Sequence, residues 1–267
     1  MYRGATDSTF KIVQDGLCLY IDAGQLRSYA QGGATAWNDL SGFGNNFTLY
    51  NGPTFSTNYR GEIQFDGVND YARMKNSTSI PRDNGTIEIW IRSLSSGDGF
   101  GTDAYGRALS FSNSTTVGSD TGGPTGTYND VPSYYSLLKN NTADNLSHFF
   151  VNNSGGGAGF YPGSNADYVT ANALYHHIVI TWSSSGTTRS FSSYVNNANN
   201  GNNDYYYPSF LPADLSSITI AMQSDASNTN PYARVKCAIG AFRLYNRRLT
   251  TAEVRQNWTV EKTRFGR

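Results

Sequence analysis

Residues 86–92 read Thr-Ile-Glu-Ile-Trp-Ile-Arg, and this stretch decides the fold class of the chain. Ile87, Ile89 and Ile91 recur at every second residue, which places them on one face of a β-strand, while threonine, glutamate, tryptophan and arginine lie on the other. Similar short runs follow one another between clusters of Gly, Asp, Asn and Ser, a pattern typical of an all-β antiparallel sandwich. We expect the remaining strands at Leu17–Ile21, Ile63–Phe65, His177–Trp182, Phe191–Val195, Ile218–Met222 and Ala238–Tyr245.

One helix is predicted, near the C-terminus. Thr250 is a good N-cap, and Glu253 three residues later completes a capping box. Leu249 before the cap and Val254 after it can form a hydrophobic staple. Val254 and Trp258 lie four residues apart and therefore share one helix face. We expect a short helix ending near Trp258 that docks on the sandwich through this face.

No linker or charge block divides the 267 residues, so we expect a single domain. Residues 12–262 form the expected sandwich, residues 1–11 an N-terminal arm, and residues 263–267 a short basic tail. Long polar stretches at 95–131, 155–163 and 196–203 are predicted to be loops.

The charge balance narrows the range of partners. Twenty Lys and Arg residues match twenty Asp and Glu residues, so the formal net charge is zero. A neutral chain lacks the basic surface that nucleic acids or anionic membranes attract, and we expect neither partner. Charged residues make up only 15% of the chain, below the usual quarter. Neutral surfaces rich in hydrogen-bonding groups suit extracellular modules and virion proteins.

The chain shows neither a membrane span nor a signal peptide. Its apolar runs stop after about seven residues, whereas about 20 are needed to span a bilayer. The N-terminal residues have no apolar core of the kind that secretory signals carry. We therefore expect that a signal has been removed, or that the protein is made in the cytoplasm and leaves the cell another way, as in a particle released by lysis.

A series of segments carries a recognisable pattern. Residues 37–45 read W-N-D-L-S-G-F-G-N, residues 65–71 read F-D-G-V-N-D-Y, and residues 176–182 read H-H-I-V-I-T-W. The other segments of the series are the opening strand Gly16–Gly24, the strand Thr86–Arg92, the hairpin Tyr194–Asn197 and the ending Ile239–Trp258. In this order, they resemble the laminin G-like family of concanavalin A-like jelly rolls, over nearly the whole chain.

The resemblance implies a two-sheet jelly-roll sandwich and a choice of roles. Members of the family occur as carbohydrate-binding modules, cell-surface adhesion domains and phage virion proteins. The virion proteins often end with this helix and a basic Arg-Phe-Gly tail, and Arg264-Phe265-Gly266 is similar. The fold alone does not assign a function.

Catalysis is not expected, because the carboxylates of a glycosidase are missing. Retaining enzymes place two carboxylates about 5–5.5 Å apart. The chain has only four glutamates, and Glu88 is the one on a central strand, with no second carboxylate on its face. His176 and His177 are adjacent and point to opposite faces of a strand, so they cannot bind one metal ion together. We predict that this protein is not an enzyme and requires no cofactor.

Calcium is the one metal that the sequence makes a candidate. Asp98 and Asp103 lie in an oxygen-rich stretch that can offer the six to eight ligands of Ca²⁺. Asp66 and Asp70 form a second acidic pair. The alternative is turn formation, because Asp side chains accept hydrogen bonds from their own backbone. Asp22 and Asp39 are open to the same interpretation.

Tyrosine is frequent, with 19 copies, and offers a flat apolar ring with a hydroxyl that suits sugar rings or a protein interface. The candidate glycan- or partner-binding residues are Tyr134, Tyr135, Tyr161, Tyr205, Tyr206 and Tyr207. The alternative is that these rings pack the loops onto the sandwich.

Two cysteines, Cys18 and Cys237, lie in the expected first and last strands. Either both are small buried hydrophobic residues, or a disulfide joins the two strands, which requires Cα atoms within about 7 Å.

Taken together, these features favour a non-catalytic structural protein of a phage virion, exposed on the capsid, tail or fibre. Its expected partners are other virion proteins, further copies of itself and host polysaccharide. The alternative is the carbohydrate-binding module of an extracellular bacterial protein.

Overall fold

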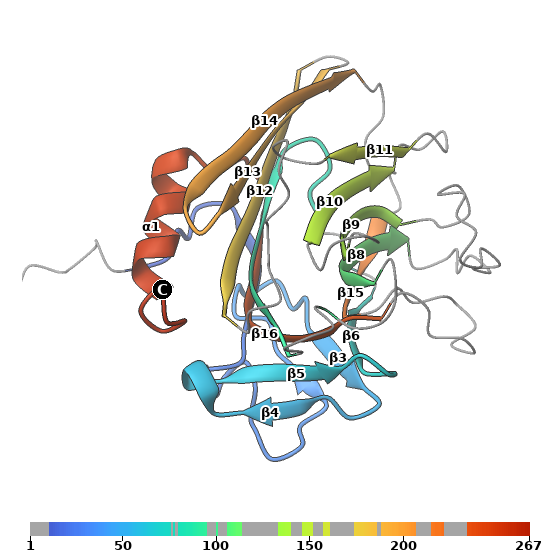
Figure 1. Ribbon diagram of the computed structural model, residues 1–267, viewed down its shortest axis with the longest axis vertical. Helices are drawn as coiled ribbons and strands as arrows, with labels where there is room; N and C mark the ends of the chain where they lie inside the picture. Colours follow the sequence, from blue (N-terminus) through green and yellow to red (C-terminus); the bar gives the residue numbers. More distant parts are fainter. Residues whose placement is uncertain are drawn as a thin grey trace, which may run out of the picture.

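Two antiparallel sheets face each other, and the one α-helix of the described residues covers the outer side of one sheet (Figure 1). The computed structural model describes residues 11–75, 77, 80–94, 100, 106–113, 133–139, 146–151, 157–160, 174–185, 188–206, 215–221 and 234–267. The two-sheet jelly roll expected from the sequence is confirmed. In the described part of the chain, no helix has the length and apolar character needed to cross a membrane.

Sheet A has the strand order β14-β13-β12-β7-β16-β5-β4, and β1 also pairs with β16. Its strands are β1 (Leu17–Asp22), β4 (Thr54–Ser56), β5 (Glu62–Asp66), β7 (Gly85–Ser93), β12 (His176–Ser185), β13 (Thr188–Val195), β14 (Ala198–Tyr206) and β16 (Lys236–Tyr245). A 3₁₀ turn, η2 (Asn58–Arg60), connects β4 to β5.

Sheet B has the order β11-β10-β9-β8-β15-β6-β3-β2. Its strands are β2 (Ala36–Trp37), β3 (Phe47–Tyr50), β6 (Tyr71–Met74), β8 (Arg107–Asn113), β9 (Ser133–Lys139), β10 (Leu146–Val151), β11 (Gly157–Phe160) and β15 (Leu215–Ile220).

Three strands lie in stretches that the sequence analysis assigned to loops, and that prediction was wrong for them. β8, β11 and β14 fall within or across the polar stretches at 95–131, 155–163 and 196–203. Backbone pairing holds them: β8 pairs with β9 and β15, β11 with β10, and β14 with β13. β11 and β14 are edge strands, which do not need an apolar face to join a sheet.

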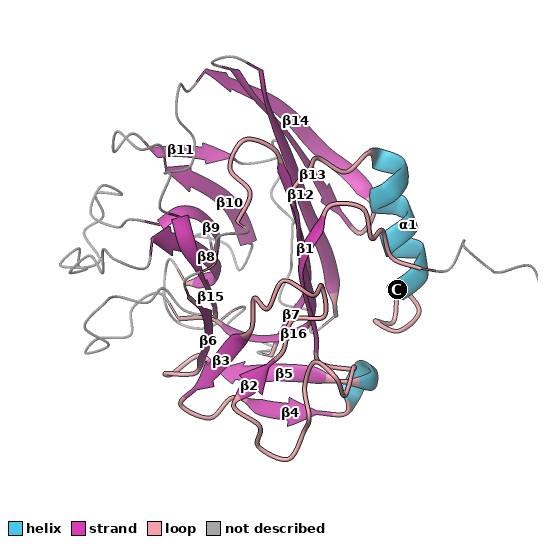
Figure 2. Ribbon diagram, turned by 180° about the vertical axis from the view of Figure 1, so that it is seen from behind, coloured by secondary structure: helices cyan, strands magenta, loops and turns pink. Residues whose placement is uncertain are grey.

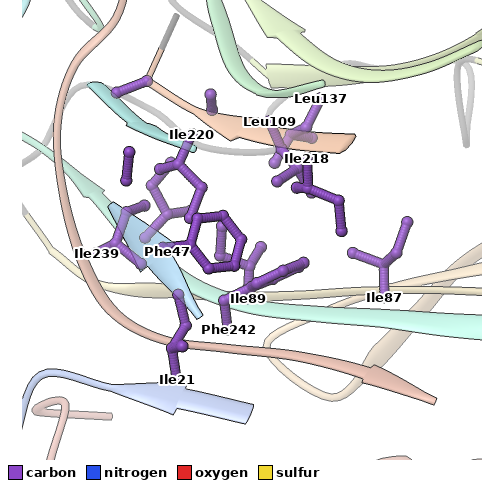
Figure 3. Packing of buried hydrophobic residues seen from close by; sticks show 14 of the residues in the cluster. Ile21, Phe47, Ile87, Ile89, Leu109, Leu137, Ile218, Ile220, Ile239 and Phe242 are labelled. Carbon is purple, nitrogen blue, oxygen red and sulfur yellow. The ribbon is translucent and has the colours of Figure 1, made fainter. Parts of the chain in front are cut away.

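The core lies between the sheets (Figure 3). Ile87, Ile89 and Ile91 point into it, as their spacing predicts. Sheet B contributes Leu109 and Ile218 from the opposite side, among others. The alternate residues of β7 are also buried, because further chain covers the outer face of sheet A.

That cover is α1 (Thr251–Glu261), on the side of sheet A away from sheet B (Figure 2). Its predicted capping box is confirmed: Glu253 N donates to Thr250 Oγ1 at 3.3 Å, and Thr250 N donates to Glu253 Oε2 at 2.8 Å. Leu249 and Val254 lie in one apolar cluster, as the hydrophobic staple requires. The helix continues three residues beyond Trp258.

Residues 263–267 are packed against the sandwich and do not project as a free tail. Arg264 forms an ion pair with Asp22 at 2.8 Å. The ring of Phe265 is buried and stacks on Trp90 at 4.3 Å. Gly240 leaves the space for this ring, since a Cβ there would lie 2.2 Å from it. The chain end thus extends the cover that α1 begins.

The two cysteines are buried and free. β1 and β16 do pair, as expected, but Cys18 lies beside Leu244, whose carbonyl its thiol contacts at 3.3 Å. Cys237 is seven residues away along β16, roughly 23 Å at the usual rise. The disulfide alternative is therefore wrong, and the interpretation as buried small residues is confirmed. Burial raises the pKa of the Cys18 thiol to about 12.

Candidate functional site

The tyrosines singled out from the sequence are divided between the two sheets. Tyr134 and Tyr135 belong to β9 in sheet B, and Tyr205 and Tyr206 belong to β14 at the edge of sheet A. Tyr161, Tyr207, Asp98 and Asp103 lie outside the described residues. The two described pairs therefore do not form one continuous strand surface, and their proposed role stays a prediction.

The acidic residues of the described loops form turns. Asp66 Oδ1 accepts from the backbone N–H of Val68 at 2.7 Å and of Asn69 at 3.2 Å. Asp39 accepts from the N–H groups of Ser41 and Asn45 in the same manner. Among the described residues, no three His, Cys, Asp or Glu side chains gather as ligands of a metal ion would.

The outer face of sheet A carries a buried ion cluster, which we call the Arg243 cluster. Arg243 Nη1 donates to Glu88 Oε1 at 2.9 Å and to Glu261 Oε2 at 2.8 Å, and Nη2 also donates to Glu261. Asn257 of α1 donates to Glu88 at 2.6 Å, and His177 Nε2 contacts Glu88 at 2.9 Å. Burial raises the pKa of Glu88, but Arg243 and His177 outweigh it and hold the pKa at about 2.

The sequence analysis considered only the strand face of Glu88, and it missed Glu261, which comes from the last turn of α1 and shares the Arg243 guanidinium with Glu88. A second buried pair joins Arg92 to Glu62 at 2.5 Å, with the Tyr175 hydroxyl donating to Glu62 at 2.9 Å. All four glutamates of the chain are paired with arginine, since Glu253 pairs with Arg247 at 2.6 Å. His177 is buried within the Arg243 cluster, consistent with a structural role.

The outer face of sheet B has a different chemistry at β3 and β6. The register sets Thr48 opposite Arg73 and Tyr50 opposite Tyr71. Tyr50 and Tyr71 stack with ring centroids 4.6 Å apart and planes 9° apart. We call Thr48, Tyr50, Tyr71 and Arg73 the tyrosine–arginine patch. β3 and β6 lie side by side, with sheet A between them and α1 (Figure 1).

Arg73 is half-buried and has no carboxylate partner within the described structure. Its Nε donates to Ser217 Oγ at 3.2 Å, and Ser217 Oγ in turn donates to the carbonyl of Met74 at 2.9 Å. Burial lowers the pKa of Arg73, and only the two tyrosines act against this effect. Sequence reasoning missed the patch because it looked for tyrosines in loops. The alternation in Tyr71-Ala72-Arg73-Met74 is the signal that could have revealed it.

The fold defines a concanavalin A-like jelly roll, a class in which a two-sheet body can support binding or catalytic surfaces. The sequence profile of the concanavalin A-like lectin/glucanases superfamily matches residues 66–255, and the chain belongs to this family. No curated protein matches the sequence significantly.

Solved structures show the same fold at low sequence identity. The binding domain of Paraclostridial Mosquitocidal Protein 1 superposes with a TM-score of 0.61 at 16% identity, covering 92% of this chain and 52% of that one. The receptor-binding domain of botulinum neurotoxin type G gives 0.60 at 12%, covering 92% and 51%. This chain therefore spans about half of those binding domains. Domain 4 of AbnA, an extracellular arabinanase from Geobacillus stearothermophilus solved with arabinotriose, gives 0.59 at 11%, covering 89% and 96%.

Proposed function

We propose that this chain is a non-catalytic, lectin-like jelly roll that binds glycans. The observation that carries the proposal is the tyrosine–arginine patch. An aromatic ring supplies an apolar face for a sugar, and a nearby guanidinium and hydroxyls supply directional hydrogen bonds. A domain of similar fold was solved with arabinotriose, and others serve toxins as receptor-binding domains, which supports a binding role.

The state of the glutamates supports a role without catalysis. A glycosidase needs one carboxyl group to donate a proton and a second carboxylate to act as nucleophile or base, both in contact with the sugar. Here Glu88 and Glu261 share one buried guanidinium, and Glu62 is held by Arg92. Each carboxylate already has a cation, and α1 contributes to the cluster from outside sheet A.

We further propose that the domain is exposed on a phage virion, as a capsid, tail or fibre component in contact with other virion proteins and further copies of itself. The neutral composition and the packed Arg-Phe-Gly ending support this assignment. The alternative within the same proposal is a glycan-binding module of an extracellular bacterial protein. Mass spectrometry of purified particles distinguishes the two, because a virion component co-purifies at constant stoichiometry.

A glycan array probed with the purified chain tests the binding proposal. We expect specific binding to a subset of glycans, with equal signal in the presence of a chelator if no metal is required. A loss of signal on chelation would assign the site to calcium-bearing loops. Absence of binding to every glycan would contradict the proposed function.

A further inference from the structure

We infer that the tyrosine–arginine patch recognises an anionic saccharide, with Arg73 pairing to the acidic group and Tyr50 packing against the sugar ring. The inference rests on the proposed glycan-binding function and narrows it to a class of ligand and to named residues. It concerns the β3–β6 region of sheet B, which lies away from α1 (Figure 2).

The first argument is the geometry of the Arg73 side chain. Its Nε is tied to Ser217, which is itself anchored to the backbone of Met74. This chain of hydrogen bonds fixes the plane of the guanidinium. Both Nη groups are left without a hydrogen-bond partner among the described residues. Two parallel N–H groups on one rigid plane fit the two oxygens of a carboxylate, or of a sulfate, in a bidentate contact.

The second argument is charge. Arg92 and Arg243 are buried and each is matched by carboxylates at 2.9 Å or less. Arg73 is half-buried, burial lowers its pKa, and no acidic group among the described residues compensates for the lost hydration. A partly desolvated cation without a counter-ion gains most when an anion binds beside it.

The third argument is the position of Tyr50 in the sheet. One side of its ring stacks on Tyr71, and no other aromatic ring contacts it in the described structure. The neighbouring strand β2 pairs only with Phe47 and Thr48, so Tyr50 extends beyond the end of β2. Its ring is half-buried and the hydroxyl-bearing Thr48 beside Arg73 is exposed. A sugar ring lying against Tyr50 can therefore bring an acidic substituent to Arg73.

The test compares oligogalacturonate, a sulfated oligosaccharide and the methyl ester of oligogalacturonate, which keeps the rings but loses the charge. We expect the wild-type chain to bind at least one of the two charged probes and to bind the ester at least ten-fold more weakly. Arg73→Gln should weaken binding of the charged probe by about ten-fold or more and leave binding of the ester unchanged. Arg255→Gln, at an exposed position on α1, is the matched control and should bind as the wild type does.

Arg73→Lys keeps the charge without the planar fork, and Tyr50→Ala removes the ring. Both should weaken binding of the charged probe, while unchanged thermal melting shows that each variant is folded. Binding of anionic glycans that survives Arg73→Gln would overturn the inference, as would exclusive binding of neutral glycans. Either result leaves the proposed lectin function standing, whereas no binding to any glycan contradicts that function.

Discussion

The outer faces of the two sheets differ in whether a buried or half-buried arginine is paired with carboxylates in the described structure. On sheet A, Arg243 meets Glu88 and Glu261, and α1 with the chain end covers the cluster. On sheet B, Arg73 is half-buried with a serine as its only side-chain partner among the described residues. The matched charge of Arg243 ties sheet A to α1, whereas the charge of Arg73 is the one that we propose pairs with a ligand.

The direction of the pKa shifts follows the same division. Burial alone disfavours charge, yet the paired groups stay ionised: the pKa of Glu88 is held at about 2, and that of Arg243 lies well above its usual value. For the two groups that have no oppositely charged partner among the described residues, burial determines the direction of the pKa shift. It lowers the pKa of Arg73 and raises that of Asp70 to about 6.

The largest expected effect comes from replacing one arginine on each face. Arg243→Met leaves Glu88 and Glu261 buried without a cation, so we expect a loss of about 3–5 kcal/mol in the free energy of unfolding. Arg73→Met removes a cation that pairs with no carboxylate in the described part of the chain, and it should change stability by less than about 1 kcal/mol. Urea unfolding at neutral pH measures both. Equal losses in the two variants would remove the distinction between the faces.

A second pair of variants tests whether the chain end seals sheet A. Phe265→Ala removes a buried ring that stacks on Trp90, and it should cost about 3 kcal/mol. Phe43 is 61% exposed in a loop, so Phe43→Ala should change stability by less than about 0.5 kcal/mol. Urea unfolding, with tryptophan fluorescence to report on the environment of Trp90, measures the difference. A cost for Phe265→Ala no larger than that for Phe43→Ala would mean that residues 263–267 do not contribute to the fold.

The elements that the sequence predicted well are those determined locally. The alternation around Ile89 and the capping box at Thr250 depend on residues within one strand or one turn, and both are confirmed. β11 and β14 were missed because pairing with neighbours, and not their own pattern, makes them strands. β8 does carry an alternating pattern, since Leu109 and Phe111 point into the core, but it was missed because the long polar stretch around it was assigned to a loop as a whole.

The side-chain arrangements on the two outer faces could not be predicted from local sequence patterns. Arg243 reaches Glu88 across 155 residues of sequence and Glu261 across 18, and no spacing rule joins them. The tyrosine–arginine patch combines residues of β3 and β6 that only the sheet register brings together. The alternation of residues 71–74 would have placed Tyr71 and Arg73 on one face of a strand. It could not have shown that Tyr50, from another strand, lies beside Tyr71.

The smallest effect concerns Asp70, an unmatched charge in the turn between β5 of sheet A and β6 of sheet B. Burial, and then the charge of Asp66, raise its pKa to about 6. The folded state therefore holds the proton more tightly than the unfolded chain, whose carboxyl has a pKa near 3.9. The stability gained from the protonated form is complete below about pH 4 and is lost as the pH rises through 6.

Asp70→Asn keeps an oxygen that can accept from Asp66 N, as the carboxylate does at 3.2 Å, but it cannot ionise. We expect it to stabilise the protein at pH 8 by about 1 kcal/mol or less, because the neighbouring turn residues Val68 and Asn69 are exposed and let solvent screen the charge, and to have no effect at pH 4. Asp66→Asn should stabilise the protein less at pH 8 than Asp70→Asn does, because relief of the repulsion between the two carboxylates is offset by weaker hydrogen bonds from the N–H groups of Val68 and Asn69. Urea unfolding at the two pH values measures both. An equal stabilisation by Asp70→Asn at pH 4 and pH 8 would show that the shape of the side chain, and not its charge, causes the effect. The contrast between matched and unmatched charges would then hold only for Arg243 and Arg73.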